Sequence, residues 1–173
     1  MPEKPFIVDL DQVDFDNVIA DINEIRKYNL QRHEMEQLTA IVLHNQDDNT
    51  CVGYKDIADD EFWVRGHMPD MPLMPGVIMC EAAAQLASFF VQKGNLMPGK
   101  VIGFGGLEDV RFRGIVVPPC RLIVMCKLTK IRPSRMMVCE FQGIVNEKIV
   151  VEGEIKGIAL PVEALKGQDS DSS

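Results

Sequence analysis

The most apolar stretch of the chain covers residues 77–91, where only Glu81, Gln85 and Ser88 interrupt a run of apolar side chains. A helix that is apolar on nearly every face is buried in a protein core, whereas a surface helix shows one apolar stripe. The sequence therefore predicts a buried central helix. A carboxylate within such a helix requires a partner or a function.

Alternation of apolar and polar residues predicts strands on both sides of this helix. Upstream, residues 38–45 and 50–57 flank the turn-forming residues 46–49, which indicates a hairpin with His44 on its exposed face. Downstream, four β-rich runs separated by turn formers cover residues 101–113, 121–131, 135–145 and 148–160. We expect these four runs to form an antiparallel meander.

The remaining segments are shorter. Apolar residues at three- and four-residue spacing predict an amphipathic helix over residues 15–28, preceded by an N-terminal arm that docks on the domain. Gly94 is expected to end the central helix in a left-handed conformation. We predict one domain over residues 1–165 and a disordered acidic tail over residues 166–173.

Composition narrows the class of protein. The chain has 173 residues, 46% of them hydrophobic, so it can bury a sizeable core, and its net charge of −8 argues against general nucleic-acid binding. Five cysteines without a C-x-x-C pair favour reduced thiols, and the three histidines show no metal-ligand spacing. No stretch resembles a signal peptide or a membrane span, so we expect a soluble, cytoplasmic protein without a metal or other cofactor.

The candidate chemistry lies just before and within the central helix. His67 belongs to a loop that carries Pro69, Pro72 and Pro75, and Pro75-Gly76 opens the helix without a capping side chain. An imidazole, a helix carboxyl and free amides at a positive helix end are the components of acid–base catalysis with stabilisation of an oxyanion.

These residues carry a family resemblance. Residues 66–69 (GHMP), 72–77 (PLMPGV) and 81–85 (EAAAQ) resemble the G-H-F-P, P-V-M-P-G-V and E-A-M-A-Q segments of the β-hydroxyacyl-acyl-carrier-protein dehydratases, including the spacing of His67 and Glu81. The resemblance implies an α+β hotdog fold, in which a curved antiparallel sheet of about six strands wraps round a central helix. It also implies a (3R)-3-hydroxyacyl-acyl-carrier-protein dehydratase that works as a homodimer or as a trimer of dimers.

The reaction suggests a role for each site residue. His67 is expected to act as the base and Glu81 as the acid, because burial favours the protonated form of a carboxyl and Glu81 is expected to be largely buried. The Gly76 amide is expected to stabilise the oxyanion, and Gln85 to orient the carboxyl. Candidate residues of the substrate tunnel are Met68, Met74, Phe104 and Gly105. As the family has it, His67 of one protomer faces Glu81 of the other.

Two departures from the family pattern leave alternatives open. Residues 33–42 replace the segment H-R-Y-P-F-L-L-V-D, and Pro119-Cys120 stands where Gly-Asp is usual. A hotdog acyl-thioester hydrolase and a catalytically silent protein that binds acyl carrier protein therefore remain alternatives. An acidic carrier protein needs a basic patch, and the candidates are Arg111, Arg113, Lys130, Arg132 and Arg135.

Overall fold

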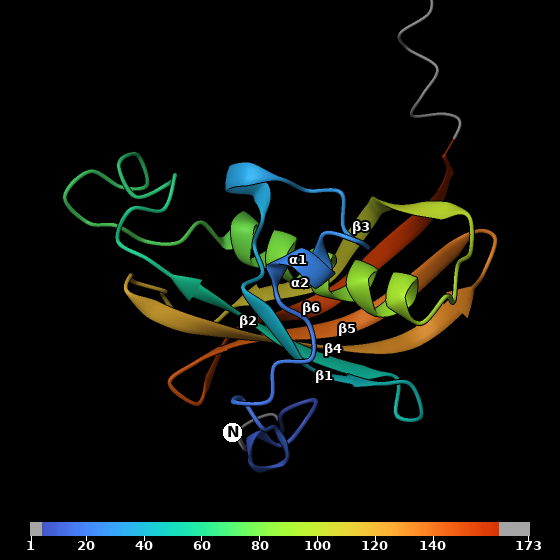
Figure 1. Ribbon diagram of the computed structural model, residues 1–173. Helices are drawn as coiled ribbons and strands as arrows, with labels where there is room; N and C mark the ends of the chain where they lie inside the picture. Colours follow the sequence, from blue (N-terminus) through green and yellow to red (C-terminus); the bar gives the residue numbers. More distant parts are fainter. Residues whose placement is uncertain (1–4, 163–173) are drawn as a thin grey trace, which may run out of the picture.

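The computed structural model describes residues 5–162, which form one curved antiparallel sheet around one long helix (Figure 1). The strands are β1 (Ala40–Asn45), β2 (Thr50–Ile57), β3 (Lys100–Phe112), β4 (Cys120–Arg132), β5 (Met136–Val145) and β6 (Lys148–Pro161). The helical segments are η1 (Leu10–Gln12), α1 (Ile22–Ile25), η2 (His33–Met35) and the long helix α2 (Gly76–Lys93). This arrangement confirms the predicted six-stranded hotdog architecture.

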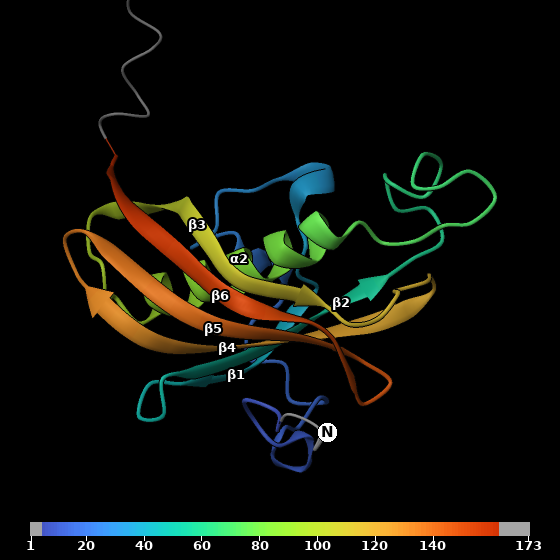
Figure 2. The same ribbon diagram turned by 180° about the vertical axis from the view of Figure 1, so that it is seen from behind.

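The order of the strands differs from the predicted meander. The sheet runs β1-β2-β4-β5-β6-β3, so β3 pairs with β6 and not with β4, which follows it in sequence. Only β4, β5 and β6 form a meander. The chain crosses from β3 at one edge to β4 beside β2, and β3 is left as an edge strand (Figure 2).

Each face of the sheet has its own apolar cluster. The concave face packs against α2, whose Leu86, Phe89 and Phe90 are completely buried. The opposite face carries the N-terminal arm, drawn in dark blue in Figure 1, where Val8 and Val13 pack against residues of β1, β2, β4 and β5. The predicted docking of the arm is therefore confirmed.

The predicted helix over residues 15–28 is wrong except for the short α1. The amides of Ile19 and Ala20 donate to the carbonyl of Ile41, at 2.9 and 3.2 Å, and the Ile41 amide donates to Ala20 at 2.8 Å. These backbone groups bind β1 and are not available for helical hydrogen bonds. The apolar residues of this stretch do not share one face, because Phe15 packs in the cluster on the outer face of the sheet, Ile25 packs in the core around α2, and Val18 is exposed.

The C-terminal end of the central helix differs from the prediction of a left-handed Gly94. Gly94 has a helical φ of −72°, and Asn95 takes the left-handed conformation with φ of 53°. A Cβ atom on Gly94 would lie 2.8 Å from the side-chain Nε2 of Gln46 and 3.0 Å from the backbone carbonyl oxygen of Phe90, so close packing favours a glycine here. The predicted tail, residues 166–173, lies outside the described residues. Within residues 5–162, no helix combines the length and apolarity needed to cross a membrane.

Candidate active site

His67 is held by the backbone of the loop between β2 and α2. Its amide donates to the Trp63 carbonyl and its carbonyl accepts from the Leu73 amide, both at 2.8 Å. Its side-chain Nδ1 lies 2.7 Å from the Leu73 carbonyl oxygen. Because a carbonyl oxygen only accepts, Nδ1 must carry a proton, and in the neutral imidazole the lone pair then lies on Nε2. The half-buried ring is thus arranged as a base at Nε2.

The N-terminus of α2 begins at Gly76, after an N-cap position filled by Pro75, and no side chain caps it. A helix N-terminus of this kind presents amide donors and a partial positive charge. Gly76 also has a packing role, since a Cβ atom there would lie 2.5 Å from the Phe112 ring at the end of β3. The glycine therefore lets the ring of Phe112 contact the helix backbone directly.

Glu81, in the second turn of α2, receives hydrogen bonds from two side-chain amides. Gln85 donates from Nε2 to Glu81 Oε1 at 2.8 Å, and Gln31 reaches the same oxygen at 3.5 Å. Both donors therefore meet Oε1, which leaves Oε2 as the oxygen that can carry and release a proton. In the single chain Glu81 is half-buried, not largely buried as expected.

Gln85 does more than orient this carboxyl. Its side-chain oxygen accepts from the Gln37 amide at 2.9 Å, its Nε2 also donates to the Met35 carbonyl at 2.6 Å, and its backbone carbonyl accepts from Asn29 Nδ2 at 2.9 Å. The buried side chain of Gln85 and its backbone carbonyl together therefore fasten residues 29–37 to the central helix.

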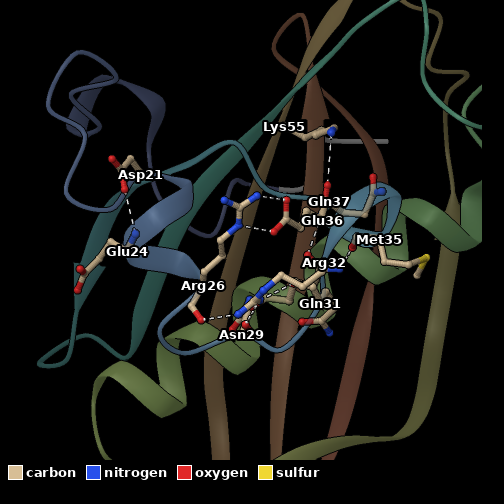
Figure 3. Close-up of polar contacts among 11 residues, drawn as sticks. Asp21, Glu24, Arg26, Asn29, Gln31, Arg32, Met35, Glu36, Gln37 and Lys55 are labelled. Atoms are coloured by element: carbon tan, nitrogen blue, oxygen red, sulfur yellow. Dashed lines mark hydrogen bonds and ion pairs between the residues drawn. The ribbon is translucent and has the colours of Figure 1, made fainter.

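Residues 29–37 are also held by hydrogen bonds from two more exposed arginines. Arg26 binds both carboxylate oxygens of Glu36, at 2.6 and 2.9 Å, and Arg32 donates to the carbonyls of Asn29 and Arg26 (Figure 3). Sequence reasoning identified residues 33–42 as a departure from the family pattern but missed the contact of the neighbouring Gln31 with Glu81. A glutamine in a polar segment carries no distinctive signal for such a contact.

The structure of one chain does not bring the two candidate catalytic residues together. Within residues 5–162 no hydrogen bond, ion pair or shared pocket joins His67 to Glu81. Of the four candidate tunnel residues, only Phe104 lines a pocket with Glu81. Met74 is buried in the core, Met68 is exposed on the loop, and Gly105 packs closely against β6.

The candidate basic residues form two groups and not one patch. One group surrounds the turn between β4 and β5 and consists of Lys130, Arg132 and Arg135. Arg132 pairs with Met136 of β5, and Met136 pairs with Ile158 of β6. Because Ile158 in turn pairs with the start of β3, this turn lies near that end of β3. Arg111 and Arg113 lie at the other end of β3, near Phe112, where Arg113 pairs with Glu152. Among the described residues, no group of three His, Cys, Asp or Glu side chains is arranged to hold a metal ion.

Comparison with known proteins gives a consistent result. A family model described as a FabA-like domain matches residues 29–154. The chain is 34% identical over 135 residues to the 3-hydroxyacyl-[acyl-carrier-protein] dehydratase FabZ of Clostridium botulinum (strain Loch Maree / Type A3), covering 78% of this chain and 92% of that protein. It is 33% identical over 138 residues to the FabZ of Clostridium beijerinckii, covering 79% of this chain and 96% of that protein.

Solved structures show the same fold at low sequence identity. The dehydratase heterocomplex ApeI:P from Xenorhabdus doucetiae superimposes with a TM-score of 0.68 at 15% identity, covering 82% of this chain and 94% of that one. At this identity the likeness concerns the fold alone.

Proposed function

The chain belongs to the FabA-like domain family, and on this basis we propose that it is a (3R)-3-hydroxyacyl-acyl-carrier-protein dehydratase. It removes water from a β-hydroxyacyl thioester to give the trans-2-enoyl thioester, in fatty-acid or related biosynthesis. The proposal is supported by relatives named as such dehydratases, which match this chain over 92% and 96% of their own lengths.

The observation that carries this proposal is the hydrogen bond between His67 Nδ1 and the Leu73 carbonyl, which leaves Nε2 as a base. In the proposed reaction Nε2 removes a proton from C2, and the electron pair of that bond forms the C2–C3 double bond. The C3–O bond breaks, and the departing hydroxyl takes a proton from Glu81 Oε2 and leaves as water. Proton transfer from the imidazolium to the carboxylate then restores the starting state.

The negative charge that develops on the thioester oxygen needs donors already in position. The Gly76 amide at the uncapped start of α2 fits this role, and loss of one such donor costs about 3–4 kcal/mol of transition-state stabilisation. The hydrogen bond from Gln85 holds Oε1 of Glu81, so that the opposite oxygen delivers the proton.

We propose that the active unit is a homodimer, in which His67 of one protomer faces Glu81 of the other. Two features support this. His67 and Glu81 share no contact within the described part of one chain, and β3 is an edge strand that exposes Phe104, Leu107 and Phe112. An unpaired edge with apolar side chains favours pairing with a second strand. The molecular mass in solution, measured by light scattering, distinguishes a dimer from a trimer of dimers.

The substrate is expected to arrive on acyl carrier protein in the cytoplasm. The two basic groups are not equal candidates for the carrier. Arg111 and Arg113 lie next to Phe112, which contacts Gly76 at the start of α2, whereas the other group lies at the opposite end of β3. We propose that the end of β3 near Arg111 receives the acidic carrier.

Hydration of crotonyl thioesters, followed by the loss of enoyl absorbance, tests the proposed function on both acyl carrier protein and coenzyme A. His67→Ala and Glu81→Gln are each expected to lower the rate at least a hundredfold. The matched controls are His33→Ala and Glu34→Gln, two exposed residues, which should retain the wild-type rate.

Two other outcomes would overturn the assignment. Release of free thiol without enoyl chemistry would indicate a thioester hydrolase. Binding of acyl carrier protein by a wild-type protein that turns over no substrate would indicate a silent binding protein.

A further inference from the structure

The two side-chain amides that donate to Glu81 Oε1 differ in how firmly they are held. Both N–H groups of the Gln85 amide are engaged, since its Nε2 donates to the Met35 carbonyl at 2.6 Å and to Glu81 at 2.8 Å. Its oxygen accepts from the Gln37 amide at 2.9 Å. Gln85 is also buried, so this donor keeps one position whatever the charge of the carboxyl group.

The Gln31 side chain is held much less firmly. Its Nε2 lies 3.5 Å from Glu81 Oε1, and in the described part of the chain this side chain makes no other hydrogen bond. Gln31 is half-buried and lines the same pocket as Glu81, which has a volume of about 110 Å³. Its amide therefore has room to move closer to the carboxyl group.

The backbone that carries Gln31 is, in contrast, well anchored. Arg32 Nη1 donates to the carbonyls of Asn29 and Gln31, at 2.8 and 2.6 Å, and Nη2 donates to the Arg26 carbonyl at 3.1 Å (Figure 3). Asn29 Nδ2 donates to the Gln85 carbonyl on α2 at 2.9 Å. The backbone of Gln31 therefore stays beside the central helix while its side chain can adjust.

The charge of Glu81 changes during the proposed reaction. The Oε2–H bond breaks, its proton passes to the departing hydroxyl, and its electron pair stays on the carboxyl group, which becomes a carboxylate. Hydrogen bonds to an ionised acceptor are shorter and stronger than those to a neutral one. Hydrogen bonds that serve catalysis are often long in the resting protein and shorten in the reacting complex. The 3.5 Å separation of Gln31 from Oε1 fits such a bond.

We infer that Gln31 is a positioning residue whose amide closes onto Glu81 Oε1 as the carboxyl group becomes ionised. Gln85 holds the carboxyl group throughout, and Gln31 adds a bond that is strong only when the negative charge is present. Such a bond stabilises the transition state more than the bound substrate, so it raises kcat and leaves KM unchanged. The inference rests on the proposed dehydratase function, in which Glu81 is the acid.

Two substitutions of Gln31 test this role, with a four-carbon 3-hydroxyacyl substrate on acyl carrier protein above neutral pH. Gln31→Leu removes the donor, and kcat is expected to fall about ten- to thirtyfold with little change in KM, the effect of one hydrogen bond to a charged group. Gln31→Glu keeps the shape of the side chain but adds a like charge that opposes ionisation of Glu81, so kcat should fall further. A side chain that only filled space would give the opposite order.

The matched controls are Gln12→Leu and Gln12→Glu, at an exposed position on the opposite face of the sheet, which should keep the wild-type kcat. Because the Gln31 side chain makes only one long hydrogen bond, Gln31→Leu should unfold at the same urea concentration as wild type. An unchanged kcat for Gln31→Leu would overturn the inference. A loss of activity that is matched by a lower urea midpoint would also overturn it.

A pH titration without substrate separates this inference from the proposed function. The side-chain ¹H–¹⁵N signals of Gln31, assigned by their loss in Gln31→Leu, should shift as carboxyl groups ionise, and most of this shift should be absent in Glu81→Gln. The other ionisable groups that line the pockets around Gln31 are present in both proteins, so their effect cancels; they are Arg26, Lys27, Tyr28, Glu36, Lys100 and Lys156.

The two assays together assign each failure to its cause. If wild type turns over no substrate but the Gln31 signals follow the ionisation of Glu81, dehydration fails and the positioning by Gln31 stands. If wild type dehydrates its substrate but the Gln31 signals shift equally in wild type and in Glu81→Gln, dehydration stands and the inference fails.

Discussion

The Nδ1 atom of His67 lies 2.7 Å from the carbonyl oxygen of Leu73, six residues further along the same loop. In a second histidine the other ring nitrogen faces a carbonyl, since Nε2 of His44 lies 3.2 Å from the Phe90 carbonyl oxygen. His44 was predicted on an exposed face, but it is half-buried against Phe89 and Phe90. Each carbonyl selects the ring nitrogen that carries the proton.

The two neutral rings should therefore show different tautomers. Long-range ¹H–¹⁵N correlation spectra above neutral pH are expected to show protonated Nδ1 for His67 and protonated Nε2 for His44. His67→Gln and His44→Gln assign the signals, and exposed His33 serves as the reference for mixed tautomers. A His67 ring protonated at Nε2 would contradict its proposed role as the base.

Gln85→Leu should destabilise the protein as well as impair the site. The change leaves the Gln37 amide and the Met35 carbonyl without their buried partner, and the free energy of unfolding is expected to fall by about 2–3 kcal/mol. Urea denaturation measures this loss, with Gln12→Leu as a control at an exposed position. An unchanged midpoint would show that residues 29–37 do not depend on Gln85.

Gly76→Ala should lower activity because the added methyl group clashes with the Phe112 ring, and removal of that ring should relieve the clash. The added methyl group would lie 2.5 Å from the Phe112 ring, which must move or push the start of α2 away. We expect a drop of at least tenfold in kcat for Gly76→Ala, corresponding to about 1.4 kcal/mol in the barrier. The double variant Gly76→Ala, Phe112→Ala should recover much of the loss relative to Phe112→Ala alone. If it recovers nothing, the contact with Phe112 is not the cause.

The Arg26–Glu36 pair should contribute to stability in a defined pH range. The hydrogen bond from Arg26 lowers the pKa of Glu36 below its ordinary value. The folded state therefore binds this proton less readily than the unfolded state, so the stabilisation is present above the ordinary glutamate pKa of about 4.3 and is lost as pH falls through the lower folded value.

Glu36→Gln is accordingly expected to reduce the free energy of unfolding by about 0.5–1 kcal/mol at pH 7, since the pair is partly exposed. The difference from wild type should begin to shrink as the pH falls below ~4.3 and should vanish once the pH is below the lowered folded pKa of Glu36. Denaturation curves across this range measure it, with exposed Glu34→Gln as the control. A difference that persists in acid would assign the effect to packing.

The order in which the cysteines react should follow how deeply each thiol is buried in the sheet. Burial raises the pKa of half-buried Cys120, whereas the pKa of fully buried Cys139 is raised well above its ordinary value by its hydrogen bond with Cys126 and by burial. Because the thiolate is the reactive form, iodoacetamide at pH 8 should modify Cys120 before Cys139 in the native protein. Mass spectrometry of labelled peptides gives the order, and all five cysteines should react in denaturant. Earlier labelling of Cys139 would contradict the packing of β5.

Local features of the chain were readable from its sequence because they depend on residues close together. Apolar side chains on every face of residues 77–91 require burial wherever that helix lies, and turn formers between alternating runs mark the strands. Pro75-Gly76 likewise indicates an uncapped helix start, which the structure has at Gly76. The residue types and spacing around His67 and Glu81 were sufficient for the family resemblance.

Features that depend on distant partners were not readable. β3 lies beside β6 because strand pairing is settled by which edges meet when the sheet closes round α2. Residues 19 and 20 bind Ile41 instead of forming a helix, and Gln85 fastens a segment about fifty residues earlier in the chain. The sequence therefore specified the candidate groups for the chemistry, while packing across long sequence separations set their hydrogen bonds. Contacts of that kind gain their energy only after the chain has folded, so no local pattern encodes them.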